Sequence, residues 1–277
     1  MKKIMVTGCN GQLGREIQKE YENDEVELLC TDVGDLDISD HAQIMEYVRQ
    51  QKPDVIINCA AYTAVDACEN AWDLAYRINA IGPRNLAIAA REVGAKLVHI
   101  STDYVFEGNA SVPYTEFDEV HPVSAYGKTK LEGERFVQQF ADRYFILRTA
   151  WLYGDGNNFA KTMLRLSENH EKVRVVCDQF GSPTSAAELA KVIHVLEPTA
   201  NYGLFHATCE GSCSWADFAE EVFRLAGRST KVERVTTEEY ASPTKRPAYS
   251  VLDNYMLRLT TDYRMADWKD ALLEYLR

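Results

Sequence analysis

The sequence has no long hydrophobic run, no low-complexity tract and fewer basic than acidic side chains. No segment approaches the roughly 18 apolar residues of a transmembrane helix. The first apolar run, Ile4–Val6, stops at Thr7 and Gly8, which argues against a secretion signal. Thirty basic against 42 acidic residues give a formal charge of −12, so we expect no nonspecific binding to nucleic acid or to an anionic membrane. A soluble, cytoplasmic protein is the prediction.

The seven cysteines are odd in number and scattered, which does not fit a disulfide framework. His206, Cys209 and Cys213 invite a zinc interpretation, but no second cluster completes the four ligands of a structural zinc site. We therefore expect reduced thiols and predict no metal ligands.

Short apolar runs alternate with amphipathic stretches over the first 150 residues. Runs of this kind are typical of buried parallel strands, and the alternation predicts an α/β fold with a doubly wound Rossmann-type parallel sheet. The predicted strands are Ile4–Thr7, Val26–Cys30, Val55–Cys59, Leu97–Ile100 and Phe145–Arg148, and the predicted helices span about 14–22, 40–51, 71–93 and 124–140.

The regular alternation weakens after residue 150, where loops become richer in polar and aromatic side chains. We predict a dinucleotide-binding domain over 1–150 and a smaller C-terminal α/β lobe over 151–277 that mainly binds substrate. A strand and a helix near 173–197 could return to the main sheet. Two further helix patterns run from Trp215 to Ala226 and from Met265 to Leu276.

Three glycines, Gly8, Gly11 and Gly14, stand between the first predicted strand and the first helix. At this position a dinucleotide pyrophosphate would meet exposed backbone N–H groups. The first glycine permits the tight turn, the second lets the backbone approach the phosphates, and the third lets the helix pack on the sheet. The alternative is a tight turn that binds nothing. No Gly-Lys-Ser/Thr follows, which excludes a nucleoside triphosphate P-loop.

Acidic and small residues follow the next strands. Asp32 ends the second strand, where a carboxylate usually meets the adenosine ribose hydroxyls and repels a 2′-phosphate. Asp35 or Asp37 could face the cofactor instead. Ala60 and Ala61 follow the third strand, where small side chains leave room for a nucleotide or, alternatively, for a close helix contact.

Tyr126 and Lys130 are four residues apart, so on a helix both side chains point to one face. A nearby ammonium favours the phenolate and brings the pKa of a tyrosine closer to neutral. Tyr126 could then give its proton to a carbonyl oxygen, with a hydrogen bond from Thr102 to the same oxygen. Taken alone, the pair is more often a solvated surface feature. Combined with the glycine turn, it predicts hydride transfer between a nicotinamide cofactor and a carbonyl.

These features together resemble the extended short-chain dehydrogenase/reductase family, over nearly the whole chain. The first two of the matching segments are shared widely in that family, and the last three resemble a branch that reduces nucleotide-linked sugars. The segments are 58–66, 101–106, 148–154, 178–184 and 245–250.

The resemblance implies NADPH- or NADH-dependent reduction of the 4-keto group of dTDP-4-dehydro-L-rhamnose to dTDP-L-rhamnose, with Thr102, Tyr126 and Lys130 as catalytic residues. The cofactor contacts it implies are Gly8, Asn10, Gly11, Gln12, Leu13, Gly14, Asp32, Asp37, Ile38, Ala60, Ala61, Tyr62, Tyr126 and Lys130. The substrate contacts it implies are Thr102, Asp103, Val105, Tyr126, Trp151, Asn158, Lys161, Gln179 and Arg246.

Other properties stay open at this point. Some relatives are homodimers with a divalent cation near the interface, for which Glu16 and Glu188 are matches, but we name no Mg²⁺ ligands. A related nucleotide-sugar epimerase or reductase would use the same catalytic residues. A noncatalytic dinucleotide-binding regulatory subunit is the alternative from another class, and the intact catalytic residues argue against it.

Overall fold

A six-stranded parallel sheet forms the centre of the computed structural model, which describes residues 1–241 and 244–277. Its strand order is β10-β5-β4-β3-β1-β2, and every neighbouring pair is parallel. The predicted doubly wound α/β fold is therefore confirmed. The strands are β1 (Lys2–Thr7), β2 (Val26–Thr31), β3 (Val55–Asn58), β4 (Lys96–Thr102), β5 (Tyr144–Thr149) and β10 (Gly203–His206).

Helices cover both faces of this sheet because successive strand side chains point to opposite sides. On one face Ile4 and Val6 pack against α1 (Gln12–Glu20) and α8 (Ala186–Leu196). On the other face Met5 packs in a second cluster, against α2, α5 and α6. These three helices span His41–Gln51, Gly82–Val93 and Ala125–Phe140.

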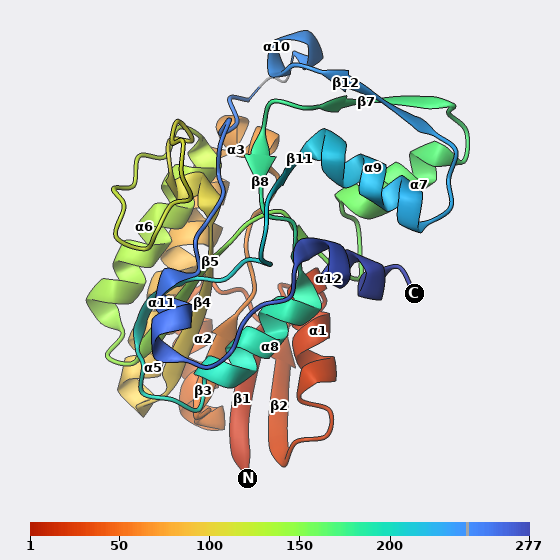
Figure 1. The fold of residues 1–277 in the computed structure, drawn as a ribbon. Helices are drawn as coiled ribbons and strands as arrows, with labels where there is room; N and C mark the ends of the chain where they lie inside the picture. Colours follow the sequence, from red (N-terminus) through yellow and green to blue (C-terminus); the bar gives the residue numbers. More distant parts are fainter. Residues whose placement is uncertain (242–243) are drawn as a thin grey trace.

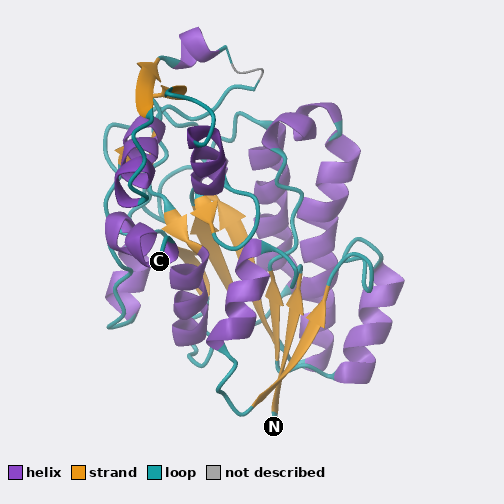
Figure 2. Ribbon diagram, turned by 90° about the vertical axis from the view of Figure 1, so that its right-hand side faces the viewer, coloured by secondary structure: helices purple, strands orange, loops and turns teal. Residues whose placement is uncertain are grey.

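The strand order reverses between β1 and β3, because the chain passes from β1 to β2 on one side and then to β3 on the other. In open α/β sheets, ligands bind outside the carboxyl ends of the strands at such a switch point. All the strands of the central sheet point toward a smaller C-terminal lobe, described below, as the arrowheads in Figure 2 show. The candidate site therefore lies between the sheet and this lobe.

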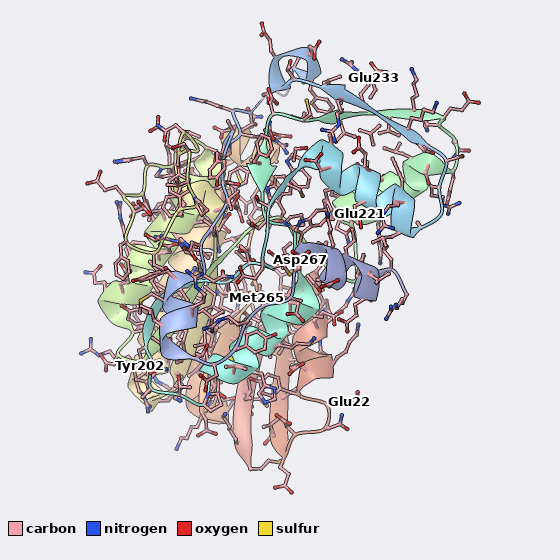
Figure 3. All side chains as sticks on the ribbon, in the orientation of Figure 1. Glu22, Tyr202, Glu221, Glu233, Met265 and Asp267 are labelled. Atoms are coloured by element: carbon pink, nitrogen blue, oxygen red, sulfur yellow. The ribbon has the colours of Figure 1, made fainter. Side chains whose placement is uncertain are left out.

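The small lobe is built on a parallel pair, β7 (Lys172–Val176) and β12 (Lys231–Val235), above α7 (Phe159–Ser167) and α9 (Trp215–Leu225) (Figure 1). Phe159 and Phe218 stack with their centroids 5.4 Å apart between the two helices. In Figure 3, Glu221 and Glu233 mark α9 and β12, while Glu22 lies near the opposite end of the molecule.

The segment near 173–197, which could have returned to the main sheet, does so only through its helix. The strand near 173–176 pairs with β12, and β10 supplies the sixth strand instead. The reason is visible in the sequence: Lys172 and Arg174 alternate with buried valines, which suits a ribbon with one exposed face, whereas Phe205 and His206 are fully buried. The helix of this segment, α8, does pack on α1.

Shorter elements complete the described fold. The predicted helix at 71–93 is continuous but contains one π-helical turn. The remaining elements are α3 (Val65–Asn70), α4 (Trp72–Tyr76), η1 (Arg77–Ile81), η2 (Asp103–Val105), β6 (Leu152–Tyr153), β8 (Phe180–Gly181), β9 (Thr184–Ser185), β11 (Cys213–Ser214), α10 (Thr237–Tyr240), α11 (Tyr255–Thr260) and α12 (Trp268–Tyr275). Over 1–241 and 244–277, no helix has the length and apolarity to cross a membrane.

Candidate active site

The glycine turn between β1 and α1 packs against the end of β3. Gly8 has φ +65°, and a Cβ there would lie 2.8 Å from the Ala60 backbone nitrogen. A Cβ at Gly14 would lie 2.6 Å from Cys9 Cα, so the first turn of α1 fits against the loop only without a side chain. The Gly11 N–H donates to the Gly8 carbonyl over 3.0 Å. This geometry leaves the helix N-terminus open toward the switch point.

An adenosine-sized cavity of about 450 Å³ begins beside this turn. Asp32 stands at its edge, with Oδ2 accepting from the Asn10 N–H at 3.0 Å and Oδ1 from the Val33 N–H at 2.8 Å. Arg77, from η1, also lines it and was missed by the sequence analysis. The predicted cofactor contacts that line this cavity are Gly8, Gly11, Asp32, Asp37, Ile38, Ala60 and Ala61.

A second cavity of about 520 Å³ adjoins the first, since both are lined by Gly11, Cys59 and Ala61. It is the central cleft of the molecule. The structure brings together the three predicted catalytic side chains here, from β4 and α6, with the glycine turn. The predicted residues that line the central cleft are Gly11, Gln12, Leu13, Gly14, Ala61, Thr102, Asp103, Tyr126, Lys130, Trp151 and Arg246.

Tyr126 lies in the first turn of α6, which Ser124 caps by accepting from the Gly127 N–H at 3.1 Å. Its ring meets Tyr104 edge to face, with centroids 5.5 Å apart. Burial raises the pKa of Tyr126 above its ordinary value, while a hydrogen bond with the Thr102 hydroxyl opposes that rise. The sequence argument expected a lowered pKa; in the structure burial prevails, so the phenol keeps its proton at neutral pH.

Lys130 follows one helical turn later and is almost fully buried. Its ammonium donates to the Ile100 carbonyl at the end of β4, over 2.5 Å. Burial lowers the pKa of Lys130 to about 8, although the Glu134 carboxylate raises it. Lys130 is therefore mostly protonated at neutral pH and begins to lose its proton just above it.

Thr102 and Asp103 line the central cleft where β4 ends. The Thr102 hydroxyl donates to Asp103 Oδ1 at 2.9 Å and accepts from the Tyr104 N–H at 3.2 Å. Asp103 is 2% exposed, and burial raises its pKa to about 6. Its Oδ2 finds no hydrogen-bond partner within the described residues, so the cleft offers an acceptor for a ligand hydroxyl.

A third cavity of about 540 Å³ opens under the small lobe and shares Trp215 and Arg246 with the central cleft. We call it the lobe cavity. Arg246 Nη2 pairs with the Asp66 carboxylate at 3.2 Å, and Gln179 donates to Thr237 Oγ1 at 3.0 Å. The other residues lining the lobe cavity are Asp66, Phe159, Met163, Arg174, Val175, Val176, Gln179, Tyr240 and Ala241.

Trp151 separates the central cleft from the core of the small lobe. Its backbone has φ +47°, and its indole stacks on Trp215 with centroids 3.5 Å apart. Gly181 packs against the same ring, where a Cβ would lie 2.7 Å from the indole nitrogen. One face of the indole is thus used within the protein, and Trp151 and Trp215 together make an aromatic wall.

The side chains of some predicted substrate contacts lie away from these cavities. Val105 is fully buried in a core cluster with Phe106 and Leu131. Asn158 caps α7 and donates to Gly154 O at 2.7 Å and Tyr275 Oη at 2.9 Å. These contacts hold loops together, which a match of sequence segments does not distinguish from ligand binding.

Three other predicted contacts also have protein partners. Lys161 pairs with Asp155 at 3.0 Å and lines a separate surface hollow beside Glu16. The Asn10 N–H is used by Asp32, and the Tyr62 N–H donates to Asn79 Oδ1 at 2.8 Å.

Asn79 was missed by the sequence analysis because the residues that it contacts, Tyr62 and Thr129, lie 17 and 50 positions away in the chain. Its amide also donates to Tyr62 O at 3.0 Å and to Thr129 Oγ1 at 3.1 Å, which links the loop after β3 to α6 between Tyr126 and Lys130. An isolated asparagine carries no local pattern that would reveal this role.

Within the described ranges, no group of three or more His, Cys, Asp or Glu side chains is placed to hold a metal ion. Glu188 instead accepts from Lys191 at 2.7 Å, from the Ala266 N–H at 3.0 Å and from Tyr263 at 3.1 Å. Glu16 pairs with Lys19 at 2.8 Å.

Comparison with known proteins identifies the family. All of residues 1–277 match the family model described as the RmlD substrate binding domain. A curated dTDP-4-dehydrorhamnose reductase from Aggregatibacter actinomycetemcomitans is 40% identical over 98% of this chain and 97% of its own. The chain belongs to the dTDP-4-dehydrorhamnose reductase family.

Solved structures agree with this assignment. A dTDP-4-dehydrorhamnose reductase from Clostridium acetobutylicum is 59% identical, with a TM-score of 0.98 over 99% of this chain and 98% of its own. One from Bacillus anthracis, in complex with NADP, is 45% identical with a TM-score of 0.97 over 99% of each chain. The prediction of an NAD(P)H-dependent reductase is thereby confirmed at the level of the dTDP-4-dehydrorhamnose reductase family.

Proposed function

We propose that this reductase converts dTDP-4-dehydro-L-rhamnose to dTDP-L-rhamnose, with Tyr126 as the proton donor. The observation that carries the proposal is that the central cleft adjoins a cavity on either side. The adenosine-sized cavity and the lobe cavity each share lining residues with the central cleft. A dinucleotide can thus enter from one end and a nucleotide sugar from the other, and their reacting ends meet beside Tyr126.

The residues around the cofactor route fit a nicotinamide dinucleotide. The open N-terminus of α1 suits the pyrophosphate, because unpaired N–H groups and the helix dipole favour an anion. Asp32 suits the adenosine ribose hydroxyls of NADH, whereas Arg77 offers the 2′-phosphate of NADPH a counter-charge in the same cavity. When bound, the dihydronicotinamide supplies the hydride.

Tyr126 and Thr102 act on the carbonyl oxygen of the sugar. Tyr126 is held protonated by burial, so it has a proton to give as negative charge develops on that oxygen. The Thr102 hydroxyl donates to Asp103 in the structure and can rotate to donate to the carbonyl oxygen instead. Asp103 Oδ2 would accept from a neighbouring sugar hydroxyl.

Lys130 supports this proton transfer by its charge. Its buried ammonium stabilises the phenolate that remains on Tyr126, and its position beside Ile100 suits a contact to the nicotinamide ribose. The protonated form is the active one. Turnover should therefore fall as the pH rises through about 8, the pKa to which burial lowers Lys130.

This pH dependence is measured as kcat/KM for NADPH from pH 6 to 10, because that ratio reports the ionisations of the free enzyme. The proposal expects an alkaline limb with a midpoint near 8, which Lys130→Arg should move to higher pH because a guanidinium stays charged. A limb that stays at the same pH in Lys130→Arg assigns the titration to another group.

Arg246 is proposed to bind the diphosphate of the sugar nucleotide. Its guanidinium lies where the lobe cavity meets the central cleft, and it can form paired hydrogen bonds with phosphate oxygens. Arg246→Met should raise the KM for the sugar nucleotide roughly 10- to 100-fold, and leave the NADPH Kd unchanged, as expected for loss of a charge-assisted contact. Arg224→Met, which removes an exposed arginine paired with Glu221, is the matched control. An unchanged KM in Arg246→Met would remove the residue from the substrate site.

A related epimerase is distinguished by its handling of cofactor. An epimerase keeps its dinucleotide through turnover, whereas a reductase must exchange it in every cycle. The test has two steps. Native mass spectrometry of the purified protein shows whether a dinucleotide is bound, and the product is then identified after incubation with NADPH and dTDP-4-dehydro-L-rhamnose. A reductase should be purified largely without cofactor and should form a product two mass units heavier than the substrate.

A further inference from the structure

A buried ion pair lies directly behind the catalytic side chains, and the reaction described above leaves it unused. Glu134 is 1% exposed and Arg148 is 3% exposed. Arg148 Nε donates to Glu134 Oε1 at 2.9 Å, and Nη2 donates to Oε2 at 2.8 Å. The two hydrogen bonds are parallel, which is the strongest and most directional arrangement for this pair of groups.

The pair joins the three elements that carry the site. Glu134 lies on α6, one helical turn after Lys130, and Arg148 lies on β5, three residues before Trp151. The Ser101 hydroxyl adds the third element, because it donates to Glu134 Oε1 at 2.5 Å from β4, next to Thr102. One carboxylate therefore fixes α6 against two adjacent strands of the sheet.

Stability alone does not account for this pair. A buried ion pair costs desolvation energy, and well-packed apolar residues often replace one without loss of stability. Here Arg148 Nη1 lacks a hydrogen-bond partner within the described residues, which adds to that cost. The guanidinium also lies over the Phe106 ring, 5.1 Å from its centroid, so its orientation is fixed from a second side.

The surroundings of Lys130 contain few ionised groups. Burial raises the pKa of the Cys59 thiol and lowers that of His99 well below its ordinary value, so both are neutral at neutral pH. The Tyr126 phenol is neutral for the same reason. Among the described neighbours of Lys130, the nearby anion is therefore Glu134, which lies on the same helix and is paired with Arg148.

We propose that Glu134 is a positioning residue for the reduction: it holds the helix of Tyr126 and Lys130 in register with the strand of Thr102, with its carboxylate one helical turn from Lys130. The inference rests on the proposed function, because it assigns Lys130 its role in that reaction. Glu134 touches neither substrate nor cofactor and acts through Lys130 and Ser101.

The test compares Glu134→Gln with Glu116→Gln. Glu116 is also buried, at 8% exposure, and accepts from the His206 and Met256 backbone N–H groups, but it does not line the central cleft. Both substitutions remove one buried carboxylate, but only Glu134→Gln leaves a buried arginine without its partner. Glu116→Gln therefore controls for the loss of a buried carboxylate, and thermal stability is compared separately. The readouts are kcat, thermal stability, and the pH profiles of kcat/KM for NADPH and of NADPH binding, which is followed by NADPH fluorescence.

In Glu134→Gln the anion that raises the pKa of Lys130 is lost, so the ammonium should deprotonate at lower pH. We expect the alkaline limb to move down by about one pH unit, in kcat/KM for NADPH and in NADPH binding alike. The altered alignment should lower kcat roughly 10- to 100-fold at the pH optimum. Glu116→Gln should show neither change.

Ser101→Ala tests alignment without changing any charge, and it serves if Glu134→Gln does not fold. It should lower kcat about tenfold and leave the alkaline limb in place. Wild-type kcat in Ser101→Ala, or an alkaline limb in Glu134→Gln that matches Glu116→Gln, would overturn the proposal. NADPH binding needs no sugar, so its pH profile can be read even if the sugar substrate has been assigned wrongly.

Discussion

Replacing Tyr126 with phenylalanine should lower kcat by roughly 10²- to 10⁴-fold, the range for loss of a general acid. The phenylalanine ring keeps the edge-to-face contact with Tyr104, and only the hydroxyl is lost. Burial holds that phenol protonated, and a phenylalanine ring has no proton to give in its place. Steady-state rates with NADPH and the 4-keto sugar measure the effect.

Two controls separate proton transfer from a general disturbance. The NADPH Kd of Tyr126→Phe should stay close to that of the wild type, because the glycine turn and Asp32 are untouched. Tyr76→Phe makes the same chemical change outside the central cleft, where the ring stacks on Trp72, and should leave kcat unchanged. Wild-type turnover by Tyr126→Phe would contradict the proposed role of Tyr126 as the proton donor.

Replacing Gly14 with alanine should weaken NADPH binding by about 100-fold or more. The new Cβ would lie 2.6 Å from Cys9 Cα and 2.8 Å from the Cys9 carbonyl carbon, and both are backbone atoms that no side-chain rotation can move. The turn or the helix must shift, which misplaces the N–H groups meant for the pyrophosphate. Overpacking of this kind should also cost about 1–3 kcal/mol of stability.

Gly227→Ala is the control for general destabilisation. Gly227 follows α9 in the small lobe with φ +63°, so alanine strains the backbone there, and a Cβ built there meets no described atom within 4 Å apart from its chain neighbours. NADPH fluorescence titrations at a temperature well below both melting points compare the two variants. Unchanged NADPH affinity in a folded Gly14→Ala variant would mean that the turn does not hold the pyrophosphate.

Much of the central sheet could be predicted from the sequence because its strands are doubly covered and read as apolar runs. β10 escaped because its apolar run is only Leu204 and Phe205, between Gly203 and His206, which is too short to stand out from a loop. The glycine turn and the Tyr126–Lys130 pair were recognisable for a different reason. Their function depends on short spacings that local geometry fixes, in a tight turn and in one turn of a helix.

Contacts between distant segments were beyond the sequence. The Asp66–Arg246 ion pair and the Trp151–Trp215 stack depend on how the small lobe folds over the sheet. The lowered pKa expected for Tyr126 failed for a related reason, since burial depends on tertiary packing and outweighs the hydrogen bond with Thr102. Val105 shows that a matching segment does not reveal which way a side chain points.

The central claim is that hydride passes to C4 of the sugar in the cleft beside Tyr126. The most direct measurement follows deuterium from NADPH and NADH labelled at nicotinamide C4, each hydrogen in turn, into the product formed from dTDP-4-dehydro-L-rhamnose. Deuterium at C4 of dTDP-L-rhamnose from one of the two labelled positions, with one cofactor oxidised per sugar, is the predicted result. Tight cofactor binding without oxidation, or a product that carries no deuterium at C4, would contradict the account.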